Sequence, residues 1–158
     1  MATTITANTL TVTLTEAISL NGQDKGSENT YTIANVTEVS QRIVEVPTSE
    51  IILLAFQATN PGAGTFDEAD VRYVRITNKD DTNHVQLTFR DESSTEFGLK
   101  LDAGQTFIYN GDNSGGVVNT MIAAGSALTV PSTLADLVDI TAVADTAAVD
   151  LEYFVVGV

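Results

Sequence analysis

The sequence predicts an all-β protein, an antiparallel β-sandwich or jelly roll of about 8–10 short strands with little helix. Threonine and valine, whose β-branched side chains favour strands, are abundant along the 158 residues. Many short segments alternate between polar and apolar side chains with a period of two. The 3.6-residue period of an amphipathic helix is almost absent. We therefore expect short strands joined by tight polar turns.

The chain begins with a small polar segment, and a regular strand follows it. Residues 1–8 are predicted to form a mobile N-terminal arm, and residues 9–158 a single β-sandwich domain. In residues 9–15 leucine and valine alternate with threonine, so this strand has one apolar and one polar face. Its polar face suits a strand at the edge of the sandwich.

The next third of the chain contains less regular strands. Residues 31–33 and 36–46 are two strand candidates, separated from the first strand by a polar loop at 21–27. Residues 51–56 are apolar at every position, which predicts a strand covered on both faces. An acidic surface loop is expected over residues 60–70.

Residues 71–110 have the clearest pattern, with four alternating segments separated by three polar turns. The apolar positions of the first three segments are Val74, Ile76, Val85, Leu87, Phe89, Phe97, Leu99 and Leu101. Consecutive alternating strands with short turns are typical of an antiparallel meander. We therefore expect three consecutive hairpins that supply one sheet or most of it.

The C-terminal part is less uniform. Residues 110–116 are rich in glycine and predict a flexible loop, and in the ambiguous segment 117–136 Ser132 could cap a single helical turn. Residues 139–144 and 149–158 predict a closing hairpin. The last strand is apolar on both faces, so it is either central in the fold or buried against a neighbouring subunit.

Composition excludes several classes of function. Seven basic and 21 acidic residues give a formal net charge of −14, which argues against nucleic acid or an anionic membrane as partner. No apolar run approaches the roughly 20 residues that span a bilayer, and no signal peptide is expected. Cysteine is absent and His84 is the one histidine, which removes thiolate zinc sites and multi-histidine metal centres. We expect no cofactor, no metal, no catalytic residue and no enzymatic activity.

Two polar loops contain the oxygen-rich side chains that Ca²⁺ prefers. Asp80 and Asp81 lie in one of them and Asp112 in the other. Neither spacing matches an EF-hand, and ordinary solvated turns are favoured for both. His84 follows the first turn and is expected to be exposed. Among 21 acids, some pair would reach glycosidase spacing by chance, so no carboxylate pair is singled out.

Three arginines are candidates for a binding patch. Arg75 and Arg90 are predicted to lie on facing strands of one hairpin, on the side away from the core, with Arg72 nearby. One interpretation is ordinary cross-strand pairing with acids such as Asp91 and Glu96. The other is a docking patch for an acidic partner surface. Ordinary pairing is favoured.

Residues 72–78, 85–89 and 97–107 form the pattern strand, asparagine-rich turn, strand and Leu-x-x-Gly-x-x-Phe. This pattern resembles the small all-β virion proteins of tailed bacteriophages, particularly capsid decoration (cement) proteins. The resemblance implies attachment to the major capsid protein or another virion protein, and stabilisation of the shell by a homo-oligomer, with a trimer favoured. It also implies synthesis in the host cytoplasm and a final location on the capsid surface.

If the resemblance holds, the N-terminal arm and the last strand are suited to clasp neighbours, for example by strand addition. The residues predicted to bind a partner are Thr3, Thr4, Ile5 and Thr6 in the arm, Arg72, Arg75 and Arg90, and Phe154, Val156 and Val158 in the last strand.

Two other classes stay open. A receptor- or glycan-binding β-sandwich of the tail-fibre or adhesin type would have to stack sugars on Tyr31, Tyr73, Tyr109 or Tyr153, since tryptophan is absent. A carboxylate-dependent hydrolase on a jelly roll is the least expected, because the chain has no cysteine and no second histidine.

Overall fold

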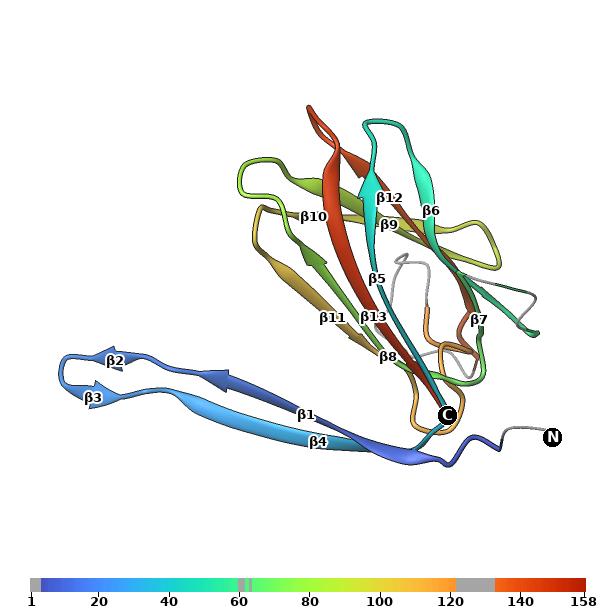
Figure 1. The fold of residues 1–158 in the computed structure, drawn as a ribbon, viewed down its shortest axis with the longest axis horizontal. Helices are drawn as coiled ribbons and strands as arrows, with labels where there is room; N and C mark the ends of the chain where they lie inside the picture. Colours follow the sequence, from blue (N-terminus) through green and yellow to red (C-terminus); the bar gives the residue numbers. More distant parts are fainter. Residues whose placement is uncertain (1–3, 60–61, 63, 122–132) are drawn as a thin grey trace. The chain divides into compact units, whose positions relative to one another are not determined.

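The structure, a computed structural model, describes residues 4–59, 62, 64–121 and 133–158. These residues form thirteen strands and no helix (Figure 1), which confirms the predicted all-β class. Accordingly, no helix in this part of the chain is long and apolar enough to cross a membrane.

The chain divides into two compact units. One contains the residues up to Thr37 together with Val158, and the other contains Glu38–Gly157. The sequence placed a boundary after residue 8 and a single domain over 9–158. The observed division lies further along the chain because the first long strand pairs only within its own unit, among the residues that the structure describes.

The first unit is a long two-stranded hairpin. Its strands β1 (Asn8–Glu16) and β4 (Ser27–Val36) pair in antiparallel fashion, and the short strands β2 (Ser19–Leu20) and β3 (Gln23–Asp24) extend the hairpin to its tip (Figure 1). Asn21 and Gly22 form the tip with φ of 52° and 76°. Two central residues with positive φ are the signature of a type I′ turn, for which Asn-Gly is the preferred sequence.

The two faces of this hairpin differ in chemistry. On one face Leu10 lies opposite Ile33 and Val12 lies opposite Tyr31. The other face is lined with threonines, two of which, Thr13 and Thr30, are hydrogen-bonded at 3.1 Å. The alternation predicted for residues 9–15 is thus present, but in a separate amphipathic ribbon. We call residues 8–36 the N-terminal ribbon.

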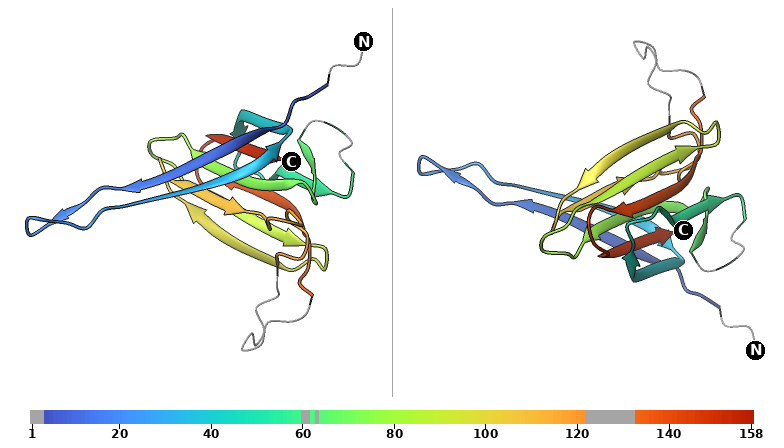
Figure 2. Two further views of the ribbon diagram at one scale, coloured as in Figure 1. Left: turned by 90° about the horizontal axis from the view of Figure 1, so that it is seen from below. Right: turned by 90° about the horizontal axis from the view of Figure 1, so that it is seen from above.

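The second unit contains two β-sheets that face each other (Figure 2). One sheet has the strand order β11-β8-β13-β5 and the other β10-β9-β12-β6-β7. All pairs are antiparallel except that of β6 with the short β7. The strands are β5 (Glu38–Val46), β6 (Ile51–Gln57), β7 (Thr65–Asp67), β8 (Val71–Asn78), β9 (Val85–Asp91), β10 (Glu96–Leu101), β11 (Thr106–Asn110), β12 (Leu137–Ala144) and β13 (Val149–Gly157).

The strand pairs are nested along the chain. β5 pairs with β13, β6 with β12, β8 with β11 and β9 with β10. Successive pairs alternate between the four-stranded and the five-stranded sheet. This winding is the jelly roll, so the predicted architecture is confirmed.

The predicted strand partners are largely wrong. Of the three hairpins expected in residues 71–110, β9–β10 forms, whereas β8 and β9 lie in different sheets, as do β10 and β11. The closing hairpin expected from residues 139–158 is also absent, because β12 and β13 belong to different sheets. The short links cross from one sheet to the facing one. The inner faces of both sheets carry the same alternation, so periodicity alone does not distinguish these arrangements.

The core lies between the two sheets and contains the predicted inner faces. Val74 and Ile76 of β8 are buried, as are Val85, Leu87 and Phe89 of β9. β13 lies between β8 and β5 (Figure 1), and most of its residues are buried. Of the two explanations for its apolar sequence, a central position in the fold is the one observed.

A β-bulge explains the unbroken apolar run in β6. Ile140 of β12 lies opposite Leu54 and Thr141 lies opposite Ile52, so Leu53 is an extra residue. Leu53 and Leu54 are therefore both buried, whereas Ile52 is 63% exposed. The prediction that both faces of this strand are covered is wrong at Ile52.

The glycine-rich loop predicted to be flexible is held in place by hydrogen bonds. The backbone groups of Asp112 and Gly116 bond to each other in both directions, at 2.5 and 3.0 Å. The Val117 N–H donates to the Glu68 carbonyl at 2.7 Å, which fixes the loop against the segment before β8. The helical turn predicted at Ser132 lies outside the described residues.

Candidate functional site

The residues predicted to bind a partner lie in several separate places. Thr3 is outside the described residues. Thr4, Ile5 and Thr6 precede β1 and are exposed, Ile5 by 68%. The rest lie on β8 (Arg72 and Arg75), on β9 (Arg90), on β13 (Phe154 and Val156) and at residue 158. Within the second unit, Arg75 and Arg90 belong to different sheets.

Arg75 lies on the outer face of the four-stranded sheet, where side chains of the same sheet accept its hydrogen bonds. Its Nη2 donates to Glu152 Oε1 at 2.5 Å and its Nη1 to Thr77 Oγ1 at 2.9 Å. Its guanidinium carbon lies 5.8 Å from the centre of the Phe154 ring. Arg75 therefore makes the ordinary cross-strand pair that the sequence favoured. Its acidic partner, Glu152, is 77 positions away in the sequence.

The same outer face carries apolar side chains that sequence analysis missed. Phe154 lies opposite Gln41, so it shares a face with Val39 and Ile43 of β5. These two side chains are 57% and 62% exposed. Val156 is fully buried, and it is therefore not available to a partner. Apolar residues occupy both alternating sets of β5, so its sequence did not indicate which face would be outside.

Arg90 lies on the outer face of the other sheet, which overturns the prediction of a joint patch with Arg75. The two strands belong to different sheets. Arg90 Nε lies 2.6 Å from Glu96 Oε1 and its Nη1 lies 3.7 Å from Asp139 Oδ1, while Nη2 pairs with Glu50. The pairing with Glu96 was one of those predicted. We call these four residues the Arg90 cluster.

Arg72 contributes to local structure. Its Nη1 donates to the Ala69 carbonyl at 2.5 Å. It also lies near Asp112, whose carboxyl has a lowered pKa, mainly because of the hydrogen bond from the Ser114 hydroxyl. The backbone carbonyl of Arg72 accepts the Gly111 N–H at 3.1 Å, which holds the start of the 111–116 loop against β8.

Two acids of the Arg90 cluster, Asp139 and Glu50, have opposite pKa shifts. Burial raises the pKa of the Asp139 carboxyl and outweighs the attraction of Arg90. The Thr141 hydroxyl, which donates to Glu50 Oε1 at 2.6 Å, lowers the pKa of Glu50. An ionised Asp139 therefore opposes folding, whereas an ionised Glu50 favours it.

Asp139→Asn and Glu50→Gln should consequently show opposite pH trends in stability. Asp139 has a raised folded pKa, so the wild type loses stability relative to Asp139→Asn as pH rises above the ordinary value of 3.8. Glu50 has a lowered folded pKa, so the wild type loses stability relative to Glu50→Gln as pH falls below the ordinary value of 4.5. Thermal unfolding of the three proteins between about pH 3 and 7 measures both differences. Parallel trends would contradict this account.

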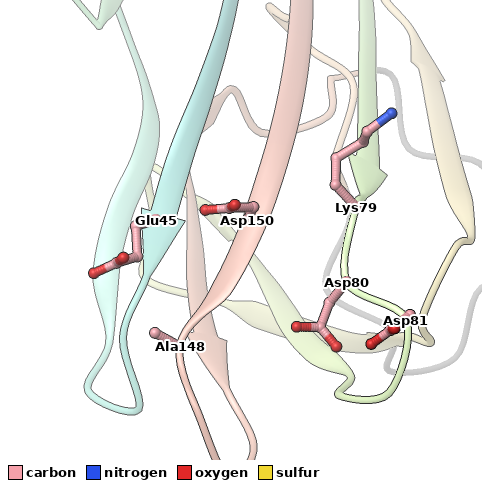
Figure 3. Close-up of a pocket in the computed structure, with 6 residues that line it drawn as sticks. All are labelled: Glu45, Lys79, Asp80, Asp81, Ala148 and Asp150. Atoms are coloured by element: carbon pink, nitrogen blue, oxygen red, sulfur yellow. The ribbon is translucent and has the colours of Figure 1, made fainter.

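A pocket of about 360 Å³ lies at one end of the sandwich (Figure 3). It is lined by Glu45, Lys79, Asp80, Asp81, Ala148 and Asp150. Asp80 Oδ1 accepts the backbone N–H groups of Thr82 at 2.8 Å and Asn83 at 2.6 Å, and these bonds lower the pKa of Asp80. In the described part of the chain, no three acidic or histidine side chains are placed to hold a metal ion. Asp80 closes the turn, in line with the favoured interpretation.

His84 has an acidic neighbour that the sequence did not indicate. Its Nδ1 lies 3.4 Å from Asp145 Oδ2, and 34% of the His84 side chain is exposed. The Asp145 N–H donates to the His84 carbonyl at 3.2 Å. These contacts tie the link between β8 and β9 to the link between β12 and β13.

Two of the four tyrosines are closed to a sugar. Tyr73 and Tyr153 are buried, with 4% and 1% exposure, whereas Tyr31 and Tyr109 are half-buried. A stacking platform needs an exposed ring face. Tyr73 and Tyr153 therefore cannot serve as such a platform.

Comparisons of the chain with protein-family models, curated proteins and solved structures found no match.

Proposed function

We propose that the chain is a non-enzymatic virion structural protein of the capsid decoration type, which binds the major capsid protein or another virion protein at the capsid surface. It stabilises the shell by burying surface across neighbouring subunits, and a symmetric homo-oligomer repeats each contact. The observation that carries this proposal is the amphipathic N-terminal ribbon.

A two-stranded ribbon is at best marginally stable in water, because it has no second layer to cover its apolar face. Leu14, Ile18 and Leu20 are 39%, 56% and 57% exposed. Such a ribbon gains stability when a neighbouring subunit covers these exposed side chains. This is the property expected of an arm that clasps its neighbours in a shell.

Three further observations support the proposal. The jelly roll is a fold that viral capsid proteins use, although lectins and enzymes use it too, so it is the weaker argument. The burial of Tyr73 and Tyr153, two of the four tyrosines, favours a structural role over glycan binding. A net charge of −14 also suits a protein whose partner is a protein surface and not the packaged nucleic acid.

The proposal predicts that the apolar face of the ribbon is needed for attachment to particles. Cells infected with the virus would express tagged wild type, Leu14→Asp or Thr13→Asp, and the particles would then be purified on a gradient. We expect the wild type and Thr13→Asp to co-purify with the heads. Leu14→Asp should be retained about tenfold less, since a buried carboxylate opposes the contact. Thr13 is the matched control, because it is adjacent but lies on the threonine face.

The outcomes separate the two parts of the proposal. Absence of the wild type from the particles, or its confinement to tails, would contradict capsid decoration. Equal retention of Leu14→Asp and the wild type would contradict the role of the ribbon.

A further inference from the structure

The free edge of β5 has the features of a strand that pairs with another strand. β5 is the last strand of the four-stranded sheet and, within the described residues, pairs only with β13. Its nine residues pair without a bulge or register shift, and none of them is proline or glycine. The other edge strands, β10, β11 and β7, have six, five and three residues. Long, regular edges are sites of strand addition.

The β5 edge also carries an exposed arginine, Arg42. None of the ion pairs between described side chains involves Arg42, which is exposed. Arg42 lies opposite Tyr153 and Ser40 lies opposite Val155, both of which are buried on the inner face. Glu38, Ser40 and Arg42 therefore point to the inner side of the sheet, at its margin.

Two-fold symmetry limits how two β5 strands can pair. When the axis is perpendicular to a continuous sheet, residues that lie opposite each other point to the same face. The axis must therefore lie between the two copies of one residue, and it cannot lie midway between two neighbouring residues of a strand. An axis at Ser40 pairs residues 38–42 of the two β5 strands and places Glu38 opposite Arg42 of the second copy, twice. An axis at Arg42 brings two arginines together. Axes at residues 39, 41, 43 and 44 place Arg42 opposite an uncharged residue.

We propose that β5 is a homodimer interface, in which the β5 strands of two copies pair antiparallel about a two-fold axis at Ser40. The two four-stranded sheets then form one continuous sheet, closed by two reciprocal Glu38–Arg42 pairs. The same charges disfavour pairing with strands that lack this pattern, which makes the contact selective.

The surroundings of Arg42 suit this contact. A groove of about 410 Å³ opens beside β5, between the margins of the two sheets. Val44 and Leu53 line it together with Arg42 and Tyr153. In the proposed register Glu38 of the second copy faces Arg42 at the margin of this partly apolar groove.

Light scattering coupled to size exclusion tests the charge pairing in the full chain. The wild type should have twice the monomer mass of 16.7 kDa. Arg42→Glu and Glu38→Arg should each weaken the dimer about tenfold or more, because like charges then face each other. The double variant Glu38→Arg/Arg42→Glu should recover the dimer. Lys100→Glu, on the edge strand β10 of the other sheet, is the control and should leave the mass unchanged.

Disulfide cross-linking tests the register. The chain has no natural cysteine, so each variant contains a single thiol. In Ser40→Cys the two sulfurs face each other across the axis, within the Cα separation of about 4.4–6.8 Å that a disulfide needs. Mild oxidation should therefore convert this variant to a covalent dimer. Glu45→Cys is exposed on the same strand, but its two copies lie about 30 Å apart, so it should stay uncross-linked.

A wild-type monomer would overturn the proposal. A trimer insensitive to the charge changes would do so as well, because an isologous contact closes with two copies. Equal cross-linking of Ser40→Cys and Glu45→Cys would exclude this register. The β5 contact does not depend on capsid decoration, since the mass and the cross-linking are measured on purified protein without particles.

Discussion

Phe89→Ala should lower the free energy of unfolding by about 3–5 kcal/mol, the largest effect that we predict for a single substitution. Phe89 of β9 is fully buried. Its ring stacks on Phe97 with a centroid distance of 4.7 Å and an interplanar angle of 3°, and it meets Phe107 edge-on at 5.3 Å. Phe107 belongs to the facing sheet, so the ring of Phe89 joins both layers. Its removal leaves a cavity and breaks these aromatic pairs.

Urea unfolding measures this loss, and Phe97→Ala is the matched control. Phe97 belongs to the same aromatic group but is 47% exposed. Its truncation removes less buried area and leaves a site open to water, so we expect a loss of about 1–2 kcal/mol. Similar losses for the two variants would show that Phe89 does not have the central place in the core that its burial indicates.

Gly116→Ala should destabilise the protein by about 2–5 kcal/mol. Gly116 has a φ of 62°, in the left-handed region that costs a residue with a Cβ about 1–2 kcal/mol. A Cβ at this position would also lie 2.8 Å from the carbonyl carbon of Ala69 and even closer to the Glu68 oxygen. Neither backbone group can withdraw easily, because Val117 donates to that same Glu68 oxygen. Overpacking against backbone adds about 1–3 kcal/mol.

The neighbouring glycine separates this steric effect from a general need for loop flexibility. A Cβ at Gly115 would find its nearest atom, Asp112 Oδ1, at 3.9 Å, which is an ordinary contact. Gly115→Ala should therefore cost less than about 1 kcal/mol. If both alanine variants unfolded at the same urea concentration, close approach would not be the reason for glycine at position 116.

The candidate surfaces were only partly predictable, and sequence distance explains the difference. Glu96 is the acid predicted for Arg90, and the two lie opposite each other in a hairpin. Asp139 of β12 and Glu50, which directly precedes β6, reach the same arginine from positions that are remote in the sequence. Similarly, the partner of Arg75 is Glu152, on the last strand. An ion pair within one hairpin follows from local pattern, whereas pairs between distant strands depend on the topology.

The amino-acid sequence by itself determined the all-β class and the inward face of most regular strands, because period-two alternation directly reflects which side chains leave water. It did not determine the sheet to which each strand belongs. In a sandwich both inner faces carry the same pattern, so a link that turns back in one sheet and a link that crosses to the other join similar strands. Only the tertiary structure placed β8 and β9 in different sheets, separated Arg75 from Arg90 and left β5 at an open edge. Many strands have similar patterns and could pair with one another, and the packing of the complete core determines which pairs form.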